Sequence, residues 1–80
     1  MPLYYFHIRN GSDLEQDPEG SELPNLDSAH AEALIVAREL AGAIPEFNND
    51  TVIEIADMNG KILLLVPFSE AAKLGSVEQG

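Results

Sequence analysis

Cysteine and tryptophan are absent from this chain of 80 residues, and basic residues are few. Without cysteine, the chain has no disulfide and no thiolate ligand for a structural metal ion. Lys and Arg total 4 against 14 Asp and Glu, which gives a formal net charge of −10 at pH 7. Binding to nucleic acid or to an anionic membrane relies on basic clusters that neutralise phosphates. Because Arg9, Arg38, Lys61 and Lys73 are scattered, the composition argues against both kinds of partner.

Long apolar segments are also missing. The longest apolar run, residues 62–66, is far shorter than the about 20 residues that a membrane-spanning helix needs. The N-terminus does not show the basic region and apolar stretch of a secretory signal peptide. We therefore expect a cytoplasmic protein. The length suits one domain, and we expect it to occupy residues 1–74, with a frayed tail at residues 75–80.

The clearest pattern in the chain is a helix between residues 26 and 44. Asp27 or Ser28 can cap its first turn by accepting hydrogen bonds from unpaired backbone N–H groups, and Pro45 ends it. Alanines in the apolar stripe should let the helix lie close to a sheet. The stripe has helical spacing and consists of Leu26, Ala29, Ala33, Val36, Ala37, Leu40 and Ile44.

Strand patterns flank this helix on both sides. Residues 3–9 are rich in aromatic and β-branched residues, and Asn10-Gly11 favours a type I′ hairpin turn into a short return strand at residues 12–15. Residues 51–57 and 61–67 form a second hairpin. The order β-β-α-β-β predicts an α+β fold, with a four-stranded antiparallel or mixed sheet and one helix packed on one face.

Four segments of the chain together form a pattern that resembles a known family. They are MPLYYFHIRNG at residues 1–11, DPEGSELPNL at residues 17–26, AEAL at residues 31–34 and VPF at residues 66–68. Together they resemble a family of short proteins of unknown function from rhizobia and related α-proteobacteria, which implies a bacterial protein and brings no activity. The first hairpin and helix are also similar to the N-terminal half of HicB-type antitoxins, a likeness of architecture that does not establish function.

An acidic segment lies between the first strand and the helix. Carboxylates spaced in this way offer hard oxygen ligands for a divalent cation. The calcium-loop pattern fails, however, because Pro18 stands where a glycine is needed and Pro24 where a bidentate glutamate is needed. The pattern therefore favours a solvated acidic loop and leaves weak cation binding open as an alternative. Its members are Asp13, Glu15, Asp17, Glu19 and Glu22.

Catalytic patterns are not found. His7 and His30 stand apart, without the further ligands that a zinc site needs. No serine lies in a G-x-S-x-G elbow, and no glycine-rich phosphate loop precedes the helix. We therefore expect no catalytic residue, no bound metal and no cofactor, and we expect that the protein is not an enzyme.

The strand at residues 61–67 is apolar on both sides. The alternation predicts Ile62, Leu64 and Val66 on one face, and Leu63 and Leu65 on the other. One helix covers one face of a sheet, so the second face needs another cover, either residues 68–74 or a partner protein. The candidate contact residues are Tyr5, His7, Arg9, Ile35, Leu63 and Leu65.

These patterns lead to three hypotheses about function. The first is a protein-interaction module with an unknown protein partner, a second copy of the chain being one option. The second is an antitoxin-like or phosphate-mimicking inhibitor that turns the acidic surface toward a basic protein. The third is weak divalent-cation binding by the acidic segment.

Overall fold

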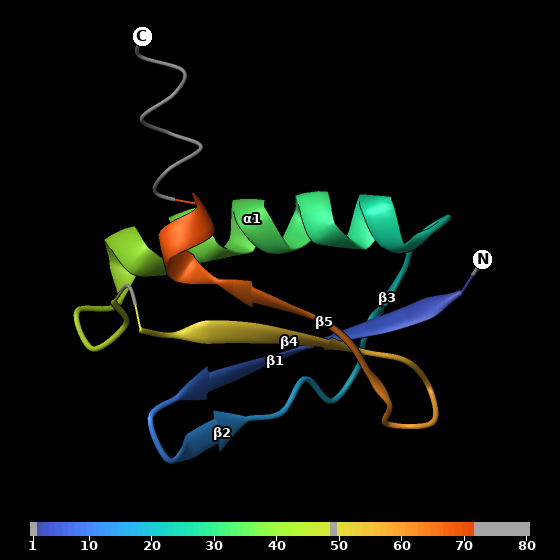
Figure 1. The fold of residues 1–80 in the computed structure, drawn as a ribbon, viewed down its shortest axis with the longest axis horizontal. Coiled ribbons are helices and arrows are strands. Elements are labelled where there is room, and N and C mark those ends of the chain that lie inside the picture. Colours follow the sequence, from blue (N-terminus) through green and yellow to red (C-terminus); the bar gives the residue numbers. More distant parts are fainter. Residues whose placement is uncertain (1, 49, 72–80) are drawn as a thin grey trace, which may run out of the picture.

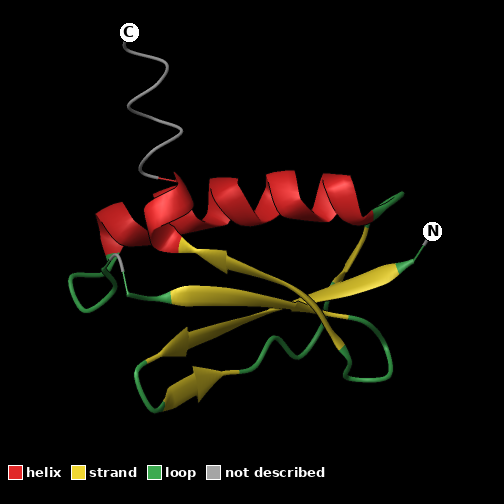
Figure 2. Ribbon diagram, in the orientation of Figure 1, coloured by secondary structure: helices red, strands yellow, loops and turns green. Residues whose placement is uncertain are grey.

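The computed structural model describes residues 2–48 and 50–71 (Figure 1). One helix lies along one face of an antiparallel sheet, which confirms the predicted α+β class and settles the sheet as antiparallel (Figure 2). The strands lie in the order β2-β1-β4-β5, and β3 pairs with the start of β1. The elements are β1 (Leu3–Asn10), β2 (Asp13–Glu15), β3 (Ser21–Glu22), α1 (Leu26–Ala43), β4 (Val52–Ala56) and β5 (Ile62–Pro67).

The helix N-cap lies two or three residues earlier than Asp27 or Ser28 would place it. Asn25 is the N-cap, and its Oδ1 accepts a hydrogen bond of 2.9 Å from the backbone N–H of Ser28. Asp27 instead lies within the first turn, where its carboxylate interacts favourably with the helix dipole. The helix ends as predicted, with Ile44 as the C-cap directly before Pro45.

The core lies between α1 and the sheet. Ala29, Ala33 and Ala37 have no exposed surface, so the helix presents its smallest side chains to the sheet and approaches it closely. Ile53 and Ile55 of β4 are also fully buried, and burial of such a side chain contributes about 1.5–3 kcal/mol. The remaining residues of the predicted helix stripe pack against this core, which confirms the stripe; they are Leu26, Val36, Leu40 and Ile44.

The segment after β5 returns to the helix side of the sheet. Phe68 is 2% exposed and meets the ring of Phe47 edge to face, with centroids 5.7 Å apart. Ala71 belongs to the same buried cluster. As far as Ala71, therefore, this segment extends the core and does not cover the opposite face, while residues 72–74 lie outside the described part of the chain.

An irregularity in β5 corrects the predicted faces of two residues. In the β4–β5 register, Ile55 lies opposite Leu64 and Ala56 lies opposite Ile62, so Leu63 is an extra residue on the β5 side. Such a bulge breaks the alternation of side chains. Leu63 packs against the core, and Ile62, predicted on the core face, is 43% exposed.

The first hairpin also differs from its prediction. Its ladder closes at the pair Asn10 and Asp13, so the loop is Gly11-Ser12. Among the described non-glycine residues none has a positive φ, whereas Gly11 has φ 65°. A type I′ turn needs positive φ at both central residues, so this loop has the glycine-first pattern of type II′. Across the described ranges, no helix is long and apolar enough to cross a membrane.

Candidate interaction face

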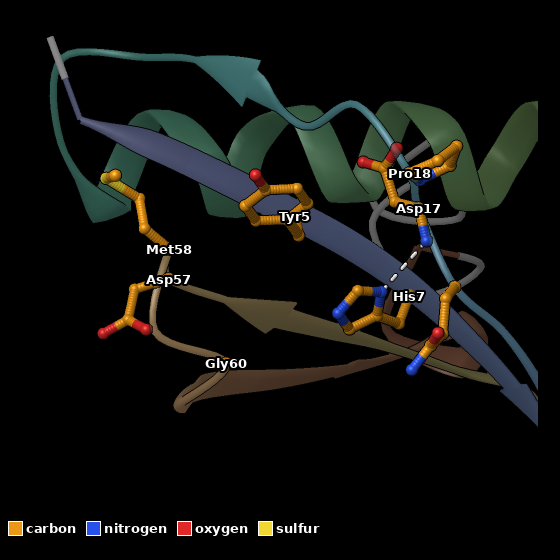
Figure 3. A pocket seen from close by; sticks show the side chains of 8 residues that line it. Tyr5, His7, Asp17, Pro18, Asp57, Met58 and Gly60 are labelled. Atoms are coloured by element: carbon orange, nitrogen blue, oxygen red, sulfur yellow. Dashed lines mark hydrogen bonds between the residues drawn. The ribbon is translucent and has the colours of Figure 1, made fainter.

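The sheet surface opposite α1 is built from directly opposed residues of neighbouring strands. Opposed residues of an antiparallel pair share a face, so the register assigns this surface without reference to side-chain rotamers. Tyr5 and His7, for example, project from the side of β1 away from the helix (Figure 3). We call this surface the open face; it comprises Leu3, Tyr5, His7, Arg9, Leu14, Glu22, Val52, Glu54, Ala56, Ile62, Leu65 and Pro67.

Exposed apolar side chains gather on the open face. Leu14, Ile62 and Leu65 are 37%, 43% and 56% exposed, and all three belong to it. Met58, at 72%, stands at one end of the face, in the turn between β4 and β5. Leu14 lies at the β2 edge of the face, and Ile62 and Leu65 lie on β5 at the opposite edge. Exposed apolar side chains on one face of a sheet are a feature of contact sites for proteins.

Charged side chains are few on the open face. Apart from His7, its charged members are Arg9 and Glu54, which form an ion pair between Nε and Oε2, and Glu22 at the β3 end. The face therefore carries one net negative charge when His7 is neutral, whereas the chain carries −10. The acidic residues of β2, Asp13 and Glu15, lie opposite Asn10 and Ile8 and so belong to the other side of the sheet.

The free edge of β5 is poorly suited to pairing with another strand. The bulge at Leu63 disturbs its backbone, and Pro67 has no N–H to donate. Bulges and edge prolines are features by which natural sheets avoid edge-to-edge pairing. Contact through the face is thus favoured over contact through this edge.

A hollow of about 390 Å³ lies at the Met58 end of the open face (Figure 3). One wall is a stacked pair of rings, Tyr5 and His7, with centroids 6.2 Å apart and an interplanar angle of 22°. The other walls come from the loop after β2 and from the β4–β5 turn. The remaining lining residues are Gln16, Asp17, Pro18, Asp57, Met58 and Gly60.

Asp17 holds the loop of this hollow against β1. Its Oδ2 accepts from the N–H of Phe6 at 3.2 Å, and its Oδ1 accepts from the N–H groups of Glu19 and Gly20, each at 3.2 Å. Partial burial alone would raise the pKa of Asp17. The hydrogen bonds from the N–H groups of Gly20, Phe6 and Glu19 outweigh that effect and hold the pKa of Asp17 below its usual value.

The same loop orients the imidazole of His7. The backbone N–H of Asp17 donates to His7 Nδ1 at 3.0 Å. An acceptor nitrogen carries no proton, so in the neutral ring the proton lies on Nε2. In Figure 3 this second nitrogen points toward the hollow between Tyr5 and Gly60.

The structure divides the contact residues proposed from sequence. Tyr5, His7, Arg9 and Leu65 lie together on the open face. Leu63 does not join them, because the bulge turns it toward the core. Ile35 is 53% exposed but belongs to α1, on the other layer of the fold, so it forms a separate surface.

The acidic segment and the second histidine show no ligand-binding arrangement. Asp17 is occupied by backbone N–H groups, and in residues 2–48 and 50–71 no group of three or more His, Asp or Glu side chains could hold a metal ion. His30 Nε2 lies 2.6 Å from Glu70 Oε2 and thereby links the start of α1 to the segment after β5.

Sequence reasoning missed Leu14, Ile62 and the hollow. Leu14 could have been placed from the hairpin register, because a two-residue loop sets it opposite Arg9. Ile62 could not, since the bulge that turns it outward leaves no mark in the alternation of apolar residues. The hollow depends on contacts of Asp17 with Phe6 and His7, which lie 11 and 10 residues away.

Comparison with known proteins places the chain in a family. The model of DUF6894, described as a domain of unknown function, matches residues 3–69. The match covers most of the 80 residues, so the chain belongs to the DUF6894 family. No curated protein and no solved structure matches the chain. The family description carries no activity, so function has to be argued from the site.

Proposed function

We propose that this member of the DUF6894 family is a protein-interaction module that binds a partner protein with its open face. The observation that carries the proposal is the presence of exposed Leu14, Ile62 and Leu65 on a sheet surface with a net charge of only −1. In a chain with net charge −10, a surface whose charges are one internal ion pair and one carboxylate at its β3 end is well suited to dehydration in a complex.

The partner in this proposal is a different protein with an apolar contact patch and a basic rim. The acidic segment, residues 13–22, follows the β2–β3 edge of the sheet, beside the open face. Basic residues around the partner's patch would complement this edge and accelerate association. A second copy of the chain would bring another −10 of charge instead, so charge favours a different protein over a homodimer.

The test compares the chain with two variants as baits. The double variant Ile62→Lys/Leu65→Lys places two charges on the open face, and Ile35→Lys places one on the exposed helix surface. Proteins retained from a lysate of the source organism by the unchanged chain and by Ile35→Lys should be lost with the double variant. Retention of the same proteins by a folded double variant would contradict the proposal.

Self-association of the chain is tested by a separate measurement. Light scattering on a sizing column, over a concentration series, measures the molar mass of the chain. The proposal expects a monomer. A dimer that the double variant dissociates would overturn the choice of a different protein as the partner.

The inhibitor hypothesis differs in the surface that it uses. If the acidic segment mimics phosphates toward a basic protein, reversing the charges of Glu15 and Glu19, neither of which is on the open face, should abolish binding, while the open-face variants should retain it. In our proposal those charge reversals slow association with the partner, whereas the open-face variants no longer bind the partner. The proposal includes no catalytic step, no cofactor, and no contact with nucleic acid or membrane, and it locates the protein in the cytoplasm.

A further inference from the structure

Within that proposed function, on which the inference rests, we propose that the hollow beside Tyr5 and His7 receives the side chain of a tyrosine of the partner. The hollow lies at one end of the open face and is already formed in the free chain. Protein interfaces concentrate their binding energy where aromatic anchors enter such pockets. The walls of the hollow, its charges and the orientation of His7 each restrict which side chain of the partner can fit there.

The walls favour a flat, apolar group. The stacked rings of Tyr5 and His7 present a planar surface of the kind on which a third ring can stack. Met58 and Pro18 stand at the rim, and a thioether next to a ring adds a favourable sulfur–aromatic contact. The volume of about 390 Å³ lies near the small end of the range for ligand pockets, which suits a single side chain.

The charges repel an anionic anchor, and the hydrogen bonds of the hollow favour a neutral anchor over a cationic one. Two carboxylates, Asp17 and Asp57, line the hollow, and no Lys or Arg does, so an anionic group would be repelled. The carboxylates have little hydrogen-bonding capacity left for a cation, because Asp17 accepts from three backbone N–H groups and Asp57 Oδ1 accepts from two. The bond from Asp17 to His7 Nδ1 leaves the proton of the neutral ring on Nε2, so a donor faces the hollow. The anchor is therefore a neutral group that can accept a hydrogen bond.

A tyrosine side chain has all of these properties. Its ring is planar and apolar, it is uncharged at neutral pH, and its phenol oxygen accepts hydrogen bonds. The ring of His7 is held from behind by Asp17 and from the side by Tyr5, so the donor is positioned before the partner arrives. Such preorganisation lowers the ordering cost of binding.

The experiment uses N-acetyl-tyrosinamide as the probe and the full chain labelled for NMR. The expected result is a saturable change confined to signals of residues around the hollow, including the methyl group of Met58. N-acetyl-phenylalaninamide, which lacks only the phenol oxygen, should bind about threefold to tenfold more weakly, the loss of one hydrogen bond. N-acetyl-lysinamide should cause no saturable change at these residues.

Two variants test the walls. Tyr5→Leu removes the ring and should lower the affinity for N-acetyl-tyrosinamide at least several-fold. Because Tyr5 is half-buried, Met58→Lys provides a second variant at a side chain that is 72% exposed, and its folding should be unaffected. Ile35→Lys is the matched control and should bind the probe as the unchanged chain does.

The inference is overturned by equal affinity for the tyrosine and phenylalanine probes, by a lysine probe that binds as tightly, or by a flat titration. Its failure is distinguishable from failure of the proposed function. If Ile62→Lys/Leu65→Lys loses the partner while the tyrosine probe does not bind, the open face is the contact surface and the anchor assignment is wrong. If the double variant keeps the partner, the proposed function itself fails.

Discussion

The imidazole of His7 accepts a hydrogen bond of 3.0 Å through Nδ1 from the backbone N–H of Asp17. The contact is reciprocal in effect, because the carboxylate of Asp17 accepts from the N–H of Phe6, the neighbour of His7 in β1. Asp17 belongs to the loop between the short strands β2 and β3. Its hydrogen bonds attach this loop to β1, in place of the backbone ladder that a continuous strand would form. They place Pro18 at the hollow and fix the direction of the His7 ring.

Replacing Asp17 by alanine should destabilise the fold, because three backbone N–H groups lose their acceptor. We expect the free energy of unfolding to fall by about 1–3 kcal/mol, measured by urea denaturation. Asp13→Ala removes a carboxylate from an exposed residue of the same segment and should change stability by no more than about 0.5 kcal/mol. Equal effects of the two substitutions would show that the Asp17 bonds do not form.

Stability should depend on the ionisation of Asp17. Its pKa is lowered in the folded chain, because the backbone hydrogen bonds outweigh partial burial. A lowered pKa gives a stabilising contribution that is complete above the unfolded value of about 3.9 and is lost as the pH falls through the folded value. Asp17→Asn should therefore have a shallower loss of stability below about pH 4 than the unchanged chain. Thermal midpoints over a pH series would measure this, and parallel curves would contradict it.

The close approach of α1 to the sheet predicts a penalty for larger side chains on its inner stripe. Ala33 has no exposed surface, so Ala33→Leu should push the helix outward and cost about 1–3 kcal/mol. Ala31→Leu makes the same change at an exposed position of the same helix and should be close to neutral. Chemical denaturation of both variants tests this, and a stable Ala33→Leu would mean that the helix is not seated on the sheet as described.

Charge on the open face should leave the fold intact. Leu65 is 56% exposed, so Leu65→Lys should change the free energy of unfolding by about 0.5 kcal/mol or less. Val66, the next residue along β5, is fully buried, and Val66→Lys should unfold the chain or cost several kcal/mol because it buries a charge. Circular dichroism and thermal melts distinguish the two. Similar damage from both substitutions would mean that Leu65 is covered by the chain itself.

The parts of the fold that sequence predicts well depend on repeated local signals. Between Ala29 and Leu40, many apolar residues recur at helical spacing. One residue that departs from this spacing therefore does not change the prediction of a helix. The cap was placed two or three residues too late, because Asn25, Asp27 and Ser28 are all good capping residues and only the geometry of the loop selects Asn25.

The parts that sequence could not predict depend on single residues and distant contacts. The extra residue Leu63 reverses the faces of Ile62 and Leu63. Because both residues are apolar, the pattern of apolar and polar residues does not indicate this bulge. Asp17 looks like one more carboxylate of an acidic loop, and its role appears only when the backbone of Phe6 lies beside it. The open face could thus be predicted in outline from β1, whereas its composition and its hollow required the structure.

The measurement that tests the central claim most directly is the solvent exposure of side-chain methyl groups in the dilute free protein. A soluble nitroxide broadens the NMR signals of methyl groups that it can approach. We expect strong broadening for Ile62, Leu65 and Leu14, and little for the buried residues Ile53 and Val66. Methyl groups of Ile62 and Leu65 as protected as those of Ile53 would show that the open face is already covered in the free chain, and the proposed interaction surface would be wrong.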